Sequence, residues 1–287
     1  MNKKIVVLGS NGCLGKQIIE TLKNNSNKLI TISRKNFDYI YNYKKIFNII
    51  KKFKPRIIIN CAAITKMDKC EKNPDEAYEV NAFFPYRLSI ISHNIGAIFI
   101  HFSTDAVFDG NKKSSYTIDD IPLPKTVYGK SKLLGEKYIS YYEKSLIIRL
   151  PMLYGKFHQN QIIGNLTNKL CKNKKIFVAK DLYCTPTNSK DIAIFIKQNI
   201  ENKKINRLIK KKILHLSSNR RLSIFDFMKK ISNIIGKSQN IVAVKNSFFE
   251  EKSIRPKNLG LKSSVKYFKN SSLSTFLYTI KKTTSSK

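Results

Sequence analysis

The chain has 287 residues, of which 42% are hydrophobic, and this composition excludes a disordered protein and allows one or two domains with a large core. The 54 Lys and Arg residues outnumber the 19 Asp and Glu residues and give a formal net charge of +35, which indicates an anionic partner. The basic residues are spread along the whole chain, a distribution that a lysine-rich composition explains as well as a binding surface does. We therefore do not expect a nucleic-acid partner.

No run approaches the roughly 18 apolar residues of a membrane span. The apolar run at the start ends at Gly9, which makes it shorter than the core of a signal peptide, about 7–15 residues. The 5 cysteines are an odd number without a C-x-x-C pair, so they indicate neither a disulfide framework nor a zinc site. We expect a cytoplasmic protein with no membrane span and no metal.

Short apolar runs alternate with helix-like segments over the first 150 residues. Strands are predicted at 4–9, 29–33, 56–63, 97–104 and 145–150, and helices at 14–25, 41–53, 76–95 and 131–142. Continuous Val, Ile and Leu strands that alternate with helices are typical of a parallel sheet buried on both faces. The predicted fold class is α/β, a Rossmann-type doubly wound parallel sheet.

The alternation loosens beyond Pro151. Strands are predicted at 175–179 and 212–217, and helices at 160–173, 189–201 and 223–236. We therefore divide the chain into a first domain, residues 1–150, and a smaller C-terminal lobe, residues 151–287. Segments near 184–200 and 212–235 are candidates to return to the first domain.

A glycine-rich loop, GSNGCLG, follows the first strand and opens a helix. Glycines allow a tight turn there, and they let backbone N–H groups and the helix dipole approach a pyrophosphate. The spacing is G-x-x-G-x-x-G, and its place at the first strand-to-helix turn predicts a dinucleotide site. We assign to the cofactor the loop residues Gly9, Asn11, Gly12, Cys13, Leu14 and Gly15.

The second strand ends in Ser33 and Arg34. An NAD site usually has an acid at this point for the ribose hydroxyls, whereas an arginine accommodates a 2′-phosphate. We therefore expect NADPH, with NADH as the alternative. Asp38 either lines the adenine end of the cofactor or caps a local loop.

The fourth strand closes with Ser103, Thr104 and Asp105, and Tyr128 and Lys132 follow on the next helix. The ligand crevice of an open parallel sheet lies at the carboxyl ends of its strands, so the first three residues face it. Tyr128 and Lys132 are one helical turn apart and share a face. A lysine beside a phenol lowers the pKa of the phenol and makes it a usable proton donor. Lys132 can also hold the nicotinamide ribose, and the group predicts a hydride-transfer site.

GxxGxxG, STD and YxxxK in this order resemble the extended short-chain dehydrogenase/reductase family. Further segments are similar to dTDP-4-dehydrorhamnose reductases and related nucleotide-sugar reductases over nearly the whole chain. These segments are NCAAITKMDKCE (60–71), VNAFFP (80–85), STDAVFDG (103–110), YGKSKLLGE (128–136), TPT (185–187) and IRPKNLGL (254–261).

The resemblance implies a catalytic triad of Thr104, Tyr128 and Lys132. A 4-keto sugar nucleotide would accept hydride from NADPH at C4, Tyr128 would protonate the new alkoxide, and Thr104 would hydrogen-bond the carbonyl oxygen. It also implies that Ala62 and Ala63 line the cofactor. The full set of residues that we assign to the cofactor outside the glycine loop is Ser33, Arg34, Asp38, Cys61, Ala62, Ala63, Thr65, Tyr128 and Lys132. We expect Asn60 to stabilise the end of its strand. Asp68 and Glu71 are either scaffold residues or site residues, and the sequence favours neither role.

The resemblance places the substrate against Thr104, Asp105, Ala106, Val107, Met152 and Arg255. Arg255 matches a family position near the substrate phosphates or the contact between lobes. Two positions depart from the family: Ala106 replaces the Tyr of STDYVF, and Met152 replaces the Trp of RTSWVYG. Both family aromatics lie near the sugar, so the reductase chemistry stands while the preferred sugar is open.

The expected function is NADPH-dependent reduction of a nucleotide-diphosphate sugar for surface-polysaccharide synthesis. An epimerase or dehydratase of the same fold is the alternative, and Asp105 is the acid after the threonine that a dehydratase needs. A second alternative is a regulatory subunit that binds the cofactor, as the methionine adenosyltransferase β-subunit does. We also consider a homodimer.

Overall fold

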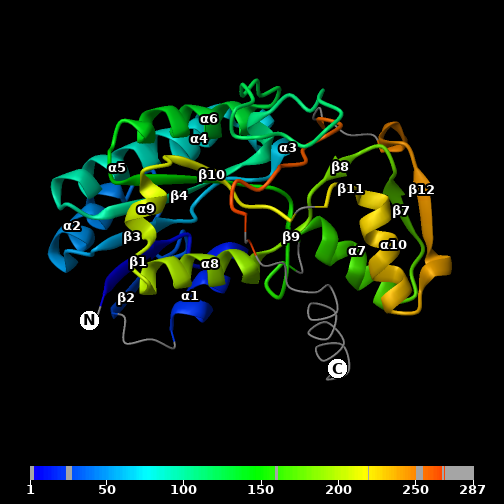
Figure 1. Cartoon of the computed structure of the whole chain (residues 1–287), viewed down its shortest axis with the longest axis horizontal. Coiled ribbons are helices and arrows are strands. Elements are labelled where there is room, and N and C mark those ends of the chain that lie inside the picture. The colour runs from blue at the N-terminus through cyan, green and yellow to red at the C-terminus, as the bar shows by residue number, and fades with distance from the viewer. Residues whose placement is uncertain are drawn as a thin grey trace.

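A computed structural model describes residues 3–23, 28–158, 161–218, 220–249, 255–266 and 268 of the chain. Its centre is a six-stranded parallel sheet in the order β10-β5-β4-β3-β1-β2 (Figure 1). The strands are β1 (Lys4–Leu8), β2 (Lys28–Ile32), β3 (Ile57–Asn60), β4 (Ile98–Thr104), β5 (Ser145–Leu150) and β10 (Ile213–His215).

Helices cover both faces of this sheet (Figure 1). One face carries α2 (Tyr43–Phe53), α4 (Pro74–Tyr78), α5 (Phe84–Asn94) and α6 (Val127–Ser140), and the other carries α1 (Cys13–Leu22), α8 (Ser189–Glu201) and α9 (Ile205–Ile209). Successive residues of β1 point to opposite faces, so Val6 and Val7 pack in two different apolar cores. The predicted doubly wound α/β fold is confirmed.

The single helix predicted over 76–95 is divided in the structure. α4 and α5 are joined by a π-helical turn, Glu79–Phe83. Within this turn the buried side chain of Asn81 accepts a hydrogen bond from Ile64 N–H at 2.9 Å and donates to Ser131 Oγ at 3.1 Å. These bonds connect the turn to the segment after β3 and to α6, a link that hydrophobic periodicity does not reveal.

A second core lies to the right of the sheet in Figure 1. It is built from α7 (Ile162–Cys171), β7 (Ile176–Ala179), α10 (Ile224–Ile234) and β12 (Ile241–Val244), in which β12 pairs in parallel with β7. Two further pairs join β8 (Tyr183–Cys184) to β11 (Leu222–Ser223) and β6 (Leu153–Tyr154) to β9 (Thr187–Asn188). β10 returns to the main sheet beside β5, and a division of the chain at residue 150 stays a prediction.

Residues 255–261 hold the loop between β4 and α6 in place. Asn258 Nδ2 donates to the carbonyl oxygen of Ser114 at 2.8 Å, and Tyr116 forms an isolated β-bridge with Leu261. Among the helices of the described residues, none combines the length and the apolar character that a membrane crossing requires.

Candidate active site

The glycine loop lies between β1 and α1, at the carboxyl end of the sheet. Gly9 has a φ of +73°, and a β-carbon there would lie 2.5 Å from Ala62 N. A β-carbon on Gly15 would lie 2.2 Å from the Gly9 carbonyl oxygen. Gly12 caps α1 (Cys13–Leu22) and has no side chain to satisfy the N–H groups of its first turn. The loop therefore fits a pyrophosphate held by backbone N–H groups, as the sequence predicts.

We expect Gly15→Ala to destabilise this loop and to weaken NADPH binding. The added β-carbon meets backbone atoms that cannot move without displacing α1, and such overpacking costs typically about 1–3 kcal/mol. Gly12→Ala is the matched variant, because its nearest atom is 3.2 Å away, and it should unfold close to the native denaturant midpoint. Urea unfolding and NADPH fluorescence titration measure both effects. Native unfolding and native affinity of Gly15→Ala would contradict the tight-loop geometry.

The segment after β2 carries the residues expected at the adenosine end. Ser33 is buried, and Arg34 Nη2 lies 2.5 Å from Glu76 Oε1 in α4. Asp38 Oδ1 accepts from Ile40 N–H at 2.8 Å and from Tyr41 N–H at 3.2 Å. Asp38 therefore caps a local loop, which is one of the two roles predicted for it. The cofactor contact of Asp38 stays a prediction.

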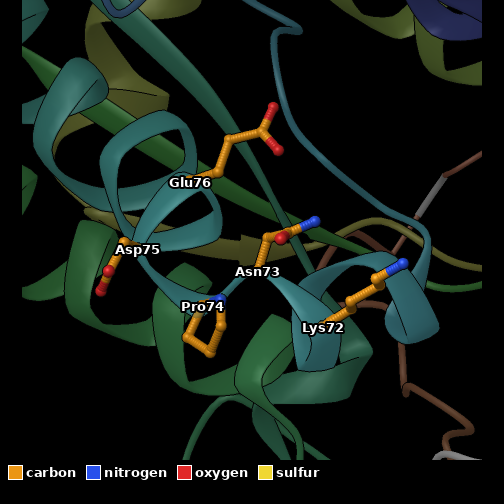
Figure 2. Close-up of a pocket in the computed structure, with 5 residues that line it drawn as sticks. All are labelled: Lys72, Asn73, Pro74, Asp75 and Glu76. Carbon is orange, nitrogen blue, oxygen red and sulfur yellow. The ribbon is translucent and has the colours of Figure 1, made fainter.

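Glu76 is shared between two cations, because Lys69 Nζ in α3 (Met67–Lys72) lies 2.8 Å from its other carboxylate oxygen. These hydrogen bonds hold the pKa of Glu76 below its usual range. Glu76 also lines a surface pocket at the junction of α3 and α4, and its carboxylate points away from that of Asp75 (Figure 2). The pocket is lined by Lys72, Asn73, Pro74, Asp75 and Glu76, none of which was predicted as a site residue.

An extended segment follows β3 and lies beside the glycine loop. Ala62 is buried against Gly9, Ala63 is half-buried, and Thr65 is exposed. Burial raises the pKa of the Cys61 thiol, which disfavours the reactive thiolate, and its contact with the cofactor stays a prediction. Asn60 holds the strand end as predicted, since its Oδ1 accepts from Ala62 N–H at 3.0 Å.

Thr104, Asp105 and Tyr128 meet at the end of β4. Thr104 Oγ1 donates to Asp105 Oδ1 at 3.0 Å, and the Tyr128 hydroxyl lies close enough to Thr104 to interact with it. Burial raises the pKa of the Asp105 carboxyl to about 7. All three side chains are buried. The structure therefore brings two residues of the predicted triad, Thr104 and Tyr128, close together.

The start of α6 fixes the position of Tyr128. The helix begins at Val127, earlier than the predicted start at residue 131, because two side chains cap it. Thr126 Oγ1 accepts from Gly129 N–H at 3.0 Å, and Glu71 Oε1 in α3 accepts from Val127 N–H at 2.8 Å. A β-carbon on Gly129 would lie 2.1 Å from the Ala106 carbonyl oxygen, so α6 is pressed against the turn that follows β4. Glu71 is thus a scaffold residue for this helix.

Lys132 lies one turn below Tyr128 and is almost fully buried. Its Nζ donates to the Phe102 carbonyl oxygen at 2.6 Å and contacts His101 Nε2 at 3.0 Å. Burial lowers the pKa of Lys132 to about 8. The expected lowering of the Tyr128 pKa by Lys132 is wrong for this structure, because burial raises the pKa of Tyr128 and Lys132 Nζ faces His101 and the Phe102 carbonyl group.

The predicted substrate residues differ in how far they are buried. The side chains of Ala106 and Val107 are covered by apolar neighbours, while Met152 is half-buried and its backbone hydrogen-bonds the Asp105 carboxylate. Arg255 is half-buried beside Pro256, whose Cβ would lie 2.3 Å from a β-carbon on Gly110. Contacts of these residues with a substrate stay predictions.

Sequence reasoning missed the polar residues behind the site. His101, Glu136 and Arg149 are buried and connect the site to neighbouring strands. Their pairing depends on contacts between β3, β4, β5 and α6, and no local motif indicates it. Within the part of the chain that the structure describes, no cluster of three or more His, Cys, Asp or Glu side chains is arranged to hold a metal ion.

The chain is similar to known proteins over most of its length. A dTDP-4-dehydrorhamnose reductase of Aggregatibacter actinomycetemcomitans is 34% identical over 227 residues, 78% of this chain and 76% of that protein. The spore coat polysaccharide biosynthesis protein SpsK of Bacillus subtilis is 32% identical over 255 residues, 88% of this chain and 87% of that protein.

A solved structure supports the same relationship. The crystal structure of dTDP-4-dehydrorhamnose reductase from Bacillus anthracis in complex with NADP matches with a TM-score of 0.84 and 30% identity, and it covers 92% of each chain. The family described as the RmlD substrate binding domain matches residues 3–282. The resemblance found in the motifs is confirmed, and the chain belongs to the RmlD substrate-binding domain family.

Proposed function

We propose that this chain is an NADPH-dependent oxidoreductase that reduces the C4 keto group of a nucleotide-activated 6-deoxy-4-keto sugar. The observation that carries the proposal is the contact of Tyr128 with Thr104 at the carboxyl end of β4. The glycine loop follows the carboxyl end of β1 and so lies on the same side of the parallel sheet. Relatives named as dTDP-4-dehydrorhamnose reductases and a structural neighbour with NADP bound support this reaction class. A relative named for spore coat polysaccharide biosynthesis supports a role in building a surface polysaccharide.

NADPH supplies the hydride when it is bound. The N–H groups of the glycine loop would hold its pyrophosphate, Arg34 its 2′-phosphate, and Lys132 its nicotinamide ribose. Thr104 donates its hydroxyl hydrogen to the substrate carbonyl oxygen, which then carries the developing negative charge.

Tyr128 supplies the proton. Because burial raises the pKa of Tyr128, the phenol stays protonated at neutral pH. The alkoxide formed at the sugar carbon is a much stronger base than a phenolate, so the proton moves from Tyr128 to the alkoxide. Asp105 accepts the Thr104 hydroxyl in the structure, so Thr104 has to exchange this partner for the substrate oxygen.

The charge of the chain suits a substrate with a diphosphate. A net charge of +35 raises the local concentration of anions and speeds their encounter with the protein. Arg255 is placed on the segment that closes over the loop after β4, and we assign it to the substrate phosphates.

We expect Arg34→Ala to lower the affinity for NADPH by roughly 10- to 100-fold and to leave the affinity for NADH unchanged, since charge-assisted hydrogen bonds contribute about 1.5–3 kcal/mol. The neighbouring Lys35→Ala is the matched control, because it removes an exposed basic residue beside Arg34. Fluorescence titration with both dinucleotides measures the ratio. Equal losses for NADPH and NADH would show that Arg34 does not read the 2′-phosphate.

The proposed function is tested by NADPH oxidation with dTDP-4-dehydrorhamnose and with other 4-keto-6-deoxy sugar nucleotides. We expect turnover with at least one of them and a C4 hydroxyl in the product by NMR. Release of a tightly bound oxidised cofactor without net NADPH consumption would instead indicate the epimerase or dehydratase. NADPH binding without turnover of any sugar nucleotide would favour the regulatory subunit.

A further inference from the structure

A buried chain of polar side chains runs from β3 to Lys132. Ala62 N–H donates to Asn60 Oδ1 at 3.0 Å, and Asn60 Nδ2 lies 3.0 Å from His101 Nδ1. His101 Nε2 in turn lies 3.0 Å from Lys132 Nζ. Asn60 and His101 have no exposed surface and Lys132 is 1% exposed, so these groups must satisfy one another.

The donors along this chain can be assigned from its backbone end. Ala62 N–H can only donate, so the Asn60 atom that faces it is the oxygen and the atom that faces His101 is the amide nitrogen. The amide nitrogen donates, and His101 Nδ1 therefore accepts. A neutral imidazole carries one proton, which must then be on Nε2 and must point at Lys132.

An N–H of His101 that points at Lys132 decides which protonation state of Lys132 fits the site. An ammonium group has three donors and no acceptor, so it opposes an N–H that points at it. A neutral amine has a lone pair that accepts from His101 Nε2 and keeps an N–H for the Phe102 carbonyl oxygen at 2.6 Å.

We propose that Asn60 and His101 are positioning residues that favour the neutral amine of Lys132, because Asn60 holds His101 in the tautomer with the proton on Nε2. This inference rests on the proposed function only in the role of Lys132, since the tautomer is a property of the protein itself. Lys132 then changes its charge closer to neutral pH, and not near pH 10 as an ordinary lysine does.

The other groups around Lys132 are consistent with this. Burial lowers its pKa to about 8, although Glu136 on the same helix and Cys61 after β3 act in the opposite direction. His101 cannot relieve the conflict by taking a second proton, because burial and the charge of Lys132 lower the pKa of the imidazole well below its usual value.

Asn60→Asp tests the proposal, because a carboxylate can accept from Ala62 N–H and from His101 at the same time. His101 then carries its proton on Nδ1, and Nε2 accepts from a charged Lys132. We expect 15N NMR of histidine-labelled protein to show a protonated Nε2 in the native chain and a protonated Nδ1 in Asn60→Asp. The signal of His101 is identified by its loss in His101→Gln.

The same signal reports the protonation of Lys132 during a pH titration of the protein without cofactor. We expect a midpoint near pH 8 in the native chain and a midpoint higher by about one to three pH units in Asn60→Asp, as for a lysine that gains a nearby opposite charge. A native His101 protonated on Nδ1 would overturn the proposal, and so would an unchanged tautomer in a folded Asn60→Asp protein. Far-ultraviolet circular dichroism establishes that the variant is folded, and neither NMR result depends on which sugar is reduced.

If Asn60→Asp does not fold, Asn60→Ser provides the second variant. A serine hydroxyl is too short to hold His101 from the strand end, so the native tautomer preference should weaken and both nitrogens should show partial protonation. Complete retention of the Nε2 proton in Asn60→Ser would show that Asn60 does not set the tautomer, and would overturn the proposal.

Discussion

Tyr128→Phe should lower kcat for the preferred sugar nucleotide by about 10²–10⁴-fold, the usual contribution of a positioned general acid. The variant removes only the hydroxyl that interacts with Thr104, and the ring remains buried. NADPH affinity should therefore change little. Single-turnover oxidation of NADPH in a stopped-flow instrument separates the chemical step from binding and from product release.

Tyr138→Phe is the control on the same helix. Its ring packs against Phe83 and Tyr86 and lies away from Thr104, so loss of its hydroxyl should leave kcat at the native value. A Tyr128→Phe protein that keeps more than a tenth of the native kcat would remove Tyr128 from the role of proton donor. It would then direct attention to Asp105, whose pKa is raised by burial to about 7.

The sheet, the glycine loop and the helix face of the site could be predicted, because each follows from a local pattern in the sequence. Continuous apolar runs such as IVVL of β1 and IIIN of β3 report burial on both faces, so the sheet could be predicted from local patterns. The glycine loop and the Tyr128–Lys132 spacing are also local. They place a cofactor loop and a helix face without any knowledge of tertiary contacts.

The surroundings of the site could not be predicted because they depend on residues far apart in the chain. Glu71 caps α6 across 56 residues of sequence, and Asn60 meets His101 across 41. The expectation that Lys132 lowers the pKa of Tyr128 was wrong for the same reason. It followed from their spacing on one helix, whereas the direction of Lys132 Nζ is decided by β4, where His101 and the Phe102 carbonyl group lie.

A second large effect is expected at the ion pair of Glu136 and Arg149, which lies behind the site. Arg149 Nη2 is 2.7 Å from Glu136 Oε2, and both side chains are less than 5% exposed. The guanidinium also stacks over the Phe108 ring at 5.2 Å. Glu136→Gln should lower the free energy of unfolding by about 3–5 kcal/mol, because it leaves a buried charge without its partner. Urea unfolding followed by circular dichroism measures this loss.

The exposed pair of Glu20 and Lys156 provides the comparison. Its side chains are 44% and 50% exposed, so Glu20→Gln should cost no more than about 1 kcal/mol. Replacement of both Glu136 and Arg149 by Leu should recover much of the loss seen in Glu136→Gln, since an apolar pair avoids the desolvation of either charge. A loss in Glu136→Gln as small as that in Glu20→Gln would mean that water reaches Arg149. β5, β10 and α6, which meet at Arg149, would then be held together mainly by their apolar contacts. The pair would contribute little to stability and would serve to orient α6, with Tyr128 and Lys132, on the sheet.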